Sequence, residues 1–374
     1  ILRLLESGVS PDKILAITFT RTAAHDLKTE ISSLGIEGTE QVHTRTVHSH
    51  ALRILMKDGV LDQTGRVPRM VIEHEQNPIL RDLDRVEFEG VRNKKQLLDS
   101  YLAGWAKLQQ DEPGFTESQI DQNFKTDLLE WFNDHSGILV GEVIPIVVEY
   151  LRNNPAVDYR NEYEYVLVDE FQDLNKCEQE FIRLIRGDAN LVIVGDDDQS
   201  IYGFKFAHPQ GIQEIDVLFG DFADVPFDVC RRCPTLVTQM ASNLISNNPN
   251  RTLGDLNAFT DNPEGIVNIV QWTDYDAEIN GLSQFIVQEI GKGIIEPSDI
   301  LILSPRRKVG YRLRDLLLTA GIPVKSYFRE SVIEKAHVQR SFSLMNFLAH
   351  SEDKISLRFL LGFNSADYRK NQYS

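Results

Sequence analysis

Continuous apolar runs alternate along this chain with segments whose apolar residues recur at helical spacing. The runs are rich in aliphatic and β-branched residues, which is typical of strands buried on both faces of a parallel sheet. Five such runs occur, at residues 14–19, 165–168, 191–194, 266–270 and 300–303. Most of them precede a polar turn and a helical pattern, so we predict an α/β fold with helices on both faces of a parallel sheet.

Glycine and proline mark the ends of several predicted helices. A helix predicted over 22–34 ends at Gly35, and one that begins near Arg307 ends at Gly321. Pro234 fits the first residue of a further helix, because its missing N–H and fixed φ suit that position.

The alternation of strands and helices stops between residues 57 and 160, where the pattern is helical throughout. A stretch rich in Asn, Pro, Asp and Gly over 247–263 indicates a linker. The predicted units are a first α/β domain at 1–56 and 161–248, an inserted helical subdomain at 57–160, part of a second α/β domain at 249–350, and the start of a further helical insertion at 351–374.

Composition fits a soluble protein of two or three domains. The 374 residues are 42% hydrophobic and 25% charged, and no apolar run reaches the roughly 18 residues of a membrane-spanning helix. Three cysteines are too few for a disulfide framework and suit a reducing cytosol, so we expect a cytoplasmic protein. The chain begins with Ile1 rather than Met and continues with leucines at helical spacing, so we expect a fragment that starts within a helix.

The formal net charge of −17 argues against a surface coated with positive charge for non-specific nucleic-acid binding. A locally basic groove remains compatible with this charge, and aromatic side chains can hold a single strand by stacking on its bases. Charge alone therefore leaves the class of ligand open.

The clearest chemical signal is a predicted strand that ends in two acids, Asp169 and Glu170. This places both at the carboxyl edge of the sheet, where open α/β folds bind ligands. Magnesium in a nucleotide site takes one or two carboxylates with phosphate oxygens, and a second acid can accept a proton from an attacking water. A solvated acidic turn is the alternative for these two residues taken alone.

The next predicted strand is followed by Gly-Asp-Asp-Asp-Gln-Ser-Ile-Tyr-Gly-Phe-Lys at 195–205. Gln199 suits the sensing of a terminal phosphate. Tyr202 and Phe204 flank a glycine and can present flat rings, for which base stacking contributes about 1–3 kcal/mol per base. Packing of both rings in a core is the alternative.

Together, these two stretches resemble the UvrD/Rep family of DNA helicases, whose Asp-Glu-Phe-Gln-Asp and Gly-Asp-Asp-Asp-Gln-Ser-Ile-Tyr-Gly blocks match here letter for letter. Other segments resemble further family blocks in the same order, at 16–24, 46–53, 230–234 and 304–323. The resemblance implies RecA-like motor domains of the P-loop NTPase class, with ATP and Mg²⁺ as cofactors. It also implies movement 3′ to 5′ on single-stranded DNA and unwinding of duplex DNA, with single-stranded DNA and duplex–single-strand junctions as partners.

The family roles transfer to particular residues of this chain. The resemblance implies that Asp169 holds Mg²⁺ and that Glu170 activates water. It implies that Gln199 couples the γ-phosphate to the DNA groove and that Arg232 acts as an arginine finger. Its implied DNA contacts are Phe19, Thr20, Thr46, His48, Tyr202, Phe204 and Lys205.

Two departures from the family pattern concern ATP. No segment reads G-x-x-x-x-G-K-[ST], the phosphate loop that the family places shortly before the helix at Ile1, so we expect weak ATP binding and very slow hydrolysis by this chain alone. The late motifs of the second motor domain are also absent. Arg231 stands where the family commonly has a tyrosine that stacks on adenine; a guanidinium can also stack on a base, but adenine selectivity is then in doubt.

Other functions remain open at this stage. One is a DNA-binding subunit with an inactive ATPase site. Another is a metal-dependent nuclease that uses Asp196, Asp197 and Asp198, although consecutive acids on one turn are expected to point in different directions. Cys230 and Cys233 form a C-x-x-C, but no second such pair or histidine pair accompanies it, so the sequence gives metal or redox use little support.

Overall fold

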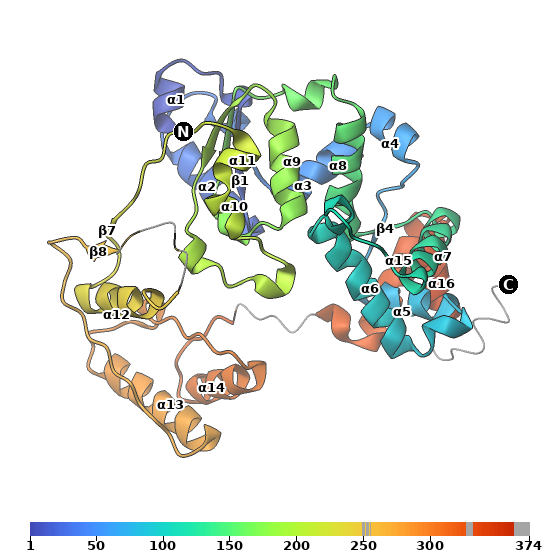
Figure 1. Ribbon diagram of the computed structural model, residues 1–374. Helices are drawn as coiled ribbons and strands as arrows, with labels where there is room; N and C mark the ends of the chain where they lie inside the picture. Colours follow the sequence, from blue (N-terminus) through green and yellow to red (C-terminus); the bar gives the residue numbers. More distant parts are fainter. Residues whose placement is uncertain (249–250, 252–253, 255, 327–331, 363–374) are drawn as a thin grey trace.

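The centre of the fold is a parallel four-stranded sheet in the order β2-β1-β5-β6. The computed structural model describes residues 1–248, 251, 254, 256–326 and 332–362 (Figure 1). The strands are β1 (Ile14–Thr18), β2 (His43–Thr46), β5 (Tyr165–Val168) and β6 (Asn190–Ile193). This arrangement confirms the predicted α/β fold.

Alternate residues of the strands pack against helices on opposite faces of the sheet. Leu15 and Ile17 of β1 join the core formed with one set of helices, whereas Ile14 packs into a second core on the other face. The helices of the first face are α3 (Val47–Leu55), α8 (Val143–Asn153) and α9 (Lys176–Arg186), and those of the second are α1 (Leu2–Glu6) and α2 (Arg21–Ser33). The sheet is therefore covered on both faces.

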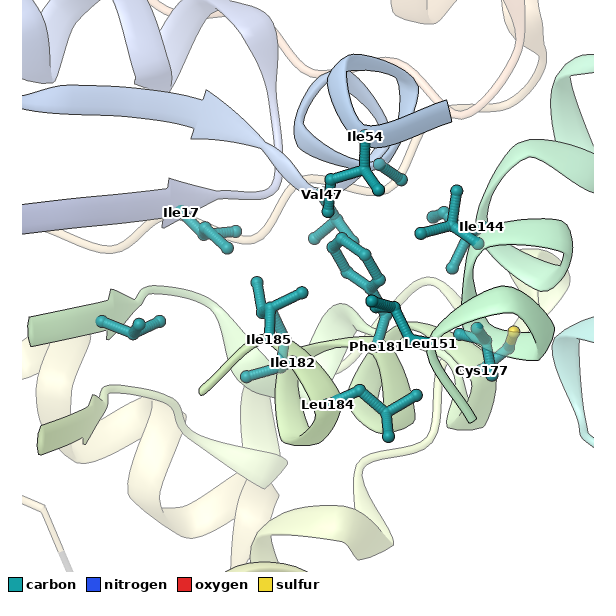
Figure 2. Close-up of a cluster of buried hydrophobic side chains, with 14 of the residues drawn as sticks. Ile17, Val47, Ile54, Ile144, Leu151, Cys177, Phe181, Ile182, Leu184 and Ile185 are labelled. Carbon is teal, nitrogen blue, oxygen red and sulfur yellow. The ribbon is translucent and has the colours of Figure 1, made fainter. Parts of the chain in front are cut away.

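The larger core is shown in Figure 2, where Ile17 from β1, Ile54 from α3, Leu151 from α8 and Phe181 from α9 point toward one another. All four side chains are buried. Burial of an aliphatic or aromatic side chain of this size contributes about 1.5–3 kcal/mol, so this face supplies much of the stability that fixes the strand ends.

The sequence-based strand predictions are wrong in three places. Residues 266–270 and 300–303 form no strand, because no partner strand lies beside them among the described residues. Ile269 is 91% exposed, so these runs are not buried either. The strand β6 is formed, but it is an edge of the sheet and Val192 is exposed on it, so it is not buried on both faces.

The inserted segment is helical, as predicted, apart from one short parallel pair of strands. Its elements are α4 (Asp58–Thr64), β3 (Met70–Val71), α5 (Glu73–Asp82), α6 (Val91–Ala106), α7 (Gln119–His135) and β4 (Ile138–Leu139). The predicted range 57–160 also contains α8, which packs against the sheet instead. Figure 1 shows α15 (Ala336–Ala349) and α16 (Lys354–Leu361) beside these helices, far from the sheet. Ile355 of α16 belongs to the same buried cluster as Phe124 and Phe132 of α7. The domain division itself stays a prediction, and 363–374 of its last segment lie outside the described residues.

Two networks of ion pairs join α16 to the inserted segment. Arg69 donates to both oxygens of Glu75, each at 2.7 Å, and to Asp353 Oδ2 at 3.0 Å. Arg358 donates through Nε to Asp82 Oδ2 at 2.8 Å and through Nη2 to the other oxygen of the same carboxylate. These contacts hold together residues that are almost three hundred positions apart in sequence.

The rest of the chain forms a smaller unit below the sheet in the view of Figure 1. Ile279 and Ile286 of one helix pack there against Leu313 and Leu317 of another. Its elements are β7 (Val229–Cys230), α12 (Thr235–Ile245), β8 (Asn257–Ala258), α13 (Tyr275–Gly291) and α14 (Arg307–Thr319); α10 (Gln210–Gln213) and α11 (Ile215–Phe219) precede it. Among the described helices, none combines the length and the apolar character that a membrane crossing needs.

Candidate functional site

Asp169 and Glu170 lie directly after β5, at the carboxyl edge of the sheet, as predicted. The Asp169 N–H donates to Ile17 O at 2.9 Å, which continues the pairing with β1 by one residue. Glu170 then adopts the left-handed conformation, with φ of 53°. A non-glycine residue in this region carries backbone strain, which is retained at functional sites when neighbouring contacts hold it.

The Asp169 and Glu170 carboxylates are close enough for their charges to interact. Partial desolvation beside the sheet raises the pKa of Asp169, and the negative charge of Glu170 raises it further. A nearby cation relieves this repulsion between like charges. Both residues are exposed, so a hydrated Mg²⁺ can reach the oxygens of Asp169.

Gln172 connects the two acidic stretches and was not among the predicted site residues. Its Nε2 donates to Glu170 Oε2 at 2.7 Å, and its Oε1 accepts from the Asp196 N–H at 3.0 Å. The side chain is buried, so the exposed Glu170 carboxylate is positioned from beneath by a fixed amide. Its place in the Asp-Glu-Phe-Gln-Asp block was the signal that could have identified it.

The acidic turn after β6 differs from the expectation. One ligand atom from each of Asp196, Asp197 and Asp198 lies within 4.8 Å of the others, so the expectation that these acids point apart is wrong. The reason is a tight 3₁₀ turn, in which Asp196 Oδ1 accepts from the Asp198 N–H at 3.0 Å. Gln199 donates to Asp196 Oδ2 at 2.8 Å, and Arg251 pairs with Asp198 at 2.8 Å. Because these protein groups already engage the carboxylates, we assign no metal site to the turn.

Four of the predicted DNA contacts form one cluster. The ring centroids of Phe19 and Tyr202 are 5.0 Å apart, and those of Tyr202 and Phe204 are 5.7 Å apart. Lys205 Nζ lies 5.1 Å from the Phe19 centroid and 5.0 Å from that of Tyr202. Phe204 is 74% exposed, which excludes core packing for this ring. Residues that follow β1 and β6 are thus combined into a surface of rings with a cation over it.

The charge of Lys205 in this cluster also acts on His48 and on Glu178 beside it. His48 Nδ1 is 3.5 Å from Glu178 Oε1, a buried carboxylate that the sequence did not single out. Partial desolvation lowers the pKa of His48, and the positive charges of Lys205 and Arg21 lower it further. Burial raises the pKa of Glu178 to about 7, although the hydrogen bond from the Asn175 N–H and the charge of Lys205 both act to lower it. The single charge of Lys205 therefore acts on both neighbours.

The two predicted threonines cap helices that begin at the same sheet edge. Thr20 Oγ1 accepts from the Ala23 N–H at 3.1 Å, and Thr46 Oγ1 accepts from the Ser49 N–H at 3.2 Å. Capping fixes the start of each helix, typically by about 1 kcal/mol. Thr20 follows β1 and Thr46 is the last residue of β2, so both lie at the carboxyl ends of neighbouring strands.

Comparison with known families matches residues 1–219, more than half of the chain, to the UvrD/REP helicase N-terminal domain. The chain belongs to this UvrD/REP family. Its parallel sheet with helices on both faces is accordingly the RecA-like sheet that the motifs predicted.

Curated relatives of this UvrD/REP chain are described as "ATP-dependent DNA helicase PcrA". The protein from Staphylococcus aureus (strain NCTC 8325 / PS 47) is 24% identical over 371 residues, and that from Staphylococcus epidermidis (strain ATCC 12228 / FDA PCI 1200) is 24% identical over 381 residues. Each match covers 95% of this chain and 50% of the relative. The chain thus spans about half the length of the curated relatives it matches.

Arg231 and Arg232 lie outside the segment that matches the UvrD/REP family. They directly follow β7 (Val229–Cys230), whereas Asp169 and Glu170 directly follow β5. The Arg231 guanidinium carbon lies 4.3 Å from the Phe259 ring centroid, so this side chain is stacked on an aromatic ring of the protein. Arg232 is exposed. The structure therefore groups the acidic and aromatic site residues and leaves the two arginines apart.

Proposed function

We propose that this chain is part of an ATP-dependent motor that moves 3′ to 5′ along single-stranded DNA and unwinds duplex DNA. One observation carries the proposal: the acids suited to ATP hydrolysis and the rings suited to base stacking, of which Phe204 is exposed, follow adjacent strands at one sheet edge. The similarity to relatives described as ATP-dependent DNA helicases supports it. Duplex–single-strand junctions are the proposed substrates of the whole protein.

On the nucleotide side, Asp169 holds Mg²⁺ and Glu170 accepts a proton from the attacking water. Bound Mg²⁺ neutralises charge that develops on the phosphate oxygens. Gln172 keeps the Glu170 carboxylate in place through its 2.7 Å hydrogen bond. Gln199 senses the γ-phosphate, and Arg232 supplies positive charge to the same group as an arginine finger, which needs closure of the smaller unit toward the sheet.

On the DNA side, Phe19, Tyr202 and Phe204 stack on successive bases. Lys205 lies over two of these rings and attracts the phosphate backbone. Gln172 and Gln199 both hydrogen-bond to Asp196, which follows β6. Tyr202 lies a few residues further along the same segment, so a change at the phosphate can be passed to the stacking rings through this short stretch of backbone. Thr20, Thr46 and His48 complete the contacts with the strand.

The stacking role predicts a loss of DNA affinity in Phe204→Ala. One stacked base contributes about 1–3 kcal/mol, so the Kd for a fluorescein-labelled oligodeoxythymidylate should rise about 5- to 150-fold in fluorescence anisotropy. Replacing Tyr202 and Phe204 together should cost about 2–6 kcal/mol. The matched control is Phe227→Ala, because Phe227 is 73% exposed and lies outside the cluster. Equal Kd values for Phe204→Ala, Phe227→Ala and the parent chain would refute the stacking role.

The catalytic role predicts that Glu170→Gln abolishes ATP turnover but not ATP binding. This substitution removes the proton acceptor while Gln172 and Asp169 stay in place. The measurement is phosphate release and nucleotide binding in a longer protein that carries a G-x-x-x-x-G-K-[ST] loop, because the 374 residues contain none and should turn over ATP very slowly alone. Unchanged turnover in Glu170→Gln would exclude this base. Single-strand binding without turnover in the longer protein would favour a DNA-binding subunit with an inactive ATPase site.

A further inference from the structure

We propose that Cys230 and Cys233 are a reversible dithiol–disulfide pair that closes the loop carrying Arg231 and Arg232. Both cysteines are free thiols, and both are half-buried and within reach of solvent. The pair is a modification site whose reaction partner is a small-molecule disulfide such as oxidised glutathione. Any effect on ATP turnover rests on the function proposed above for Arg232.

The loop is held in a closed shape by a single amide. Asn262 Nδ2 donates to Cys230 O at 2.7 Å and to Cys233 O at 2.8 Å, so one side chain fixes the carbonyls at both ends of the C-x-x-C. Cys230 O also accepts from the Phe259 N–H at 3.0 Å, next to the β7–β8 pair. The backbone at both cysteines is therefore held by one side chain before any bond forms between the two sulfurs.

The sulfur of Cys230 already contacts the backbone of its partner. The Cys233 N–H donates to Cys230 Sγ at 3.4 Å. This hydrogen bond is the main cause that lowers the pKa of Cys230, whereas burial and the hydrogen bond between the two side chains raise that of Cys233. One thiol is thus favoured as the attacking thiolate and the other as the thiol that resolves the intermediate.

A metal site is the competing use of a C-x-x-C. Structural zinc needs four ligands, and catalytic zinc needs three from the protein. Within the part of the chain that the structure describes, the one grouping of three potential metal-ligating side chains is the turn Asp196–Asp198. The cysteine pair has no third ligand beside it there, which favours redox chemistry over metal binding.

The exchange proceeds in two balanced steps. The Cys230 thiolate attacks one sulfur of the small-molecule disulfide, forms a mixed disulfide and releases the other half as a thiolate. Cys233, as its thiolate, then attacks Cys230 Sγ, forms the Cys230–Cys233 bond and releases the second half. The protein loses two electrons and two protons, and the disulfide is reduced to two thiols. Excess dithiothreitol reverses both steps.

Closure of this bond restrains the two arginines between the cysteines. The covalent ring contains Arg231 and Arg232, so their backbone can no longer open. Arg231 is stacked on Phe259, and the restraint keeps it there. Because Arg232 must approach the γ-phosphate in the proposed function, the oxidised protein should hydrolyse ATP at least about tenfold more slowly, a barrier increase of about 1.4 kcal/mol.

The pair is tested by equilibrating the chain in graded ratios of reduced to oxidised glutathione. After an acid quench, alkylation in denaturant and intact mass spectrometry count free thiols: three in the reduced chain, and one, Cys177, once the pair is closed. The ratio of the disulfide form to the dithiol form should be at least about tenfold higher in native protein than in urea. The reason is that the two hydrogen bonds from Asn262 raise the effective concentration of one thiol at the other. Asn262→Ala should remove most of this gain. The exposed Asn243→Ala on α12 should not.

Equal ratios in native and unfolded chain would overturn the proposal, and so would a product that stops at mixed disulfides. Protection of both thiols by Zn²⁺ alone, at one ion per chain, would overturn it in favour of a metal site. In a longer protein with a phosphate loop, oxidation should slow turnover, dithiothreitol should restore it, and Cys233→Ser should remove the effect. A protein with no ATPase under any condition would defeat the proposed function while leaving the thiol measurement intact.

Discussion

Replacing the buried Arg358 by Met should loosen the attachment of α16 to the inserted helices. The Arg358 side chain is 2% exposed and donates two hydrogen bonds to the carboxylate of Asp82, which is 22% exposed. Removing one partner of a buried pair costs about 3–5 kcal/mol, because the remaining charge is left without compensation. Asp82 keeps a hydrogen bond from Trp131 Nε1 at 3.1 Å and some contact with water, so we expect the lower end, about 3 kcal/mol. Met keeps the apolar part of the Arg358 side chain, so the lost stability comes from the charge pairing alone.

The measurement is urea unfolding followed by tryptophan fluorescence. Two of the three tryptophans, Trp105 and Trp131, lie in the inserted helices, so the signal reports mainly on this part. A loss of about 3 kcal/mol moves the midpoint by about 1–3 M urea at typical slopes. The control is Arg85→Met, whose ion pair with Asp127 lies in the same inserted segment but whose arginine is 44% exposed. It should shift the midpoint far less, because an exposed ion pair contributes little to stability. Equal small shifts in both variants would refute the assignment of this energy to burial.

Two further substitutions test the charges around the site. Burial raises the pKa of Glu178 to about 7, so its contribution to stability is present below pH 4.5 and is lost as the pH rises to 7. Glu178→Gln should therefore make the urea midpoint less dependent on pH over this range. Glu164→Gln, at an exposed residue, should leave the pH dependence of the midpoint unchanged. Gln172→Glu keeps the acceptor for the Asp196 N–H but sets a second carboxylate against Glu170, so it should destabilise the chain by about 1–3 kcal/mol at pH 8 and by clearly less at pH 5; a loss independent of pH would point to packing instead.

The sequence predicted the sheet well wherever its residues are apolar on both faces. Strands β1 and β5 were found because Ile14 and Val166 belong to continuous aliphatic runs. Strand β2 was missed because its residues, His-Thr-Arg-Thr, carry no hydrophobic pattern and are held by pairing with β1 alone. The runs at 266–270 and 300–303 were wrongly predicted as strands for the opposite reason. They are apolar, but an apolar segment forms a strand only where a neighbouring strand completes its hydrogen bonds.

The candidate site was predicted in its parts but not in its connections. Motif order identified Asp169, Tyr202 and the residues around them. The contact between Phe19 and Lys205 depends on the spatial adjacency of strand ends that are distant in sequence, which no local pattern encodes. Gln172 was overlooked for a related reason: its importance comes from being buried between Glu170 and Asp196, and burial of one amide cannot be read from its neighbours in the chain.

The pairing of Arg69 with Asp353 has a consequence for synthesis of the protein. The two residues are 284 positions apart, so the ribosome must make all the residues between them before the pair can form. Until then Arg69 and Glu75 have each other but lack α16, and the apolar side chains that Ile355 later covers stay accessible. Domains generally fold as their residues emerge during translation, but this helical part has to wait for its last piece. The nascent inserted helices are therefore the region that chaperones are expected to protect longest.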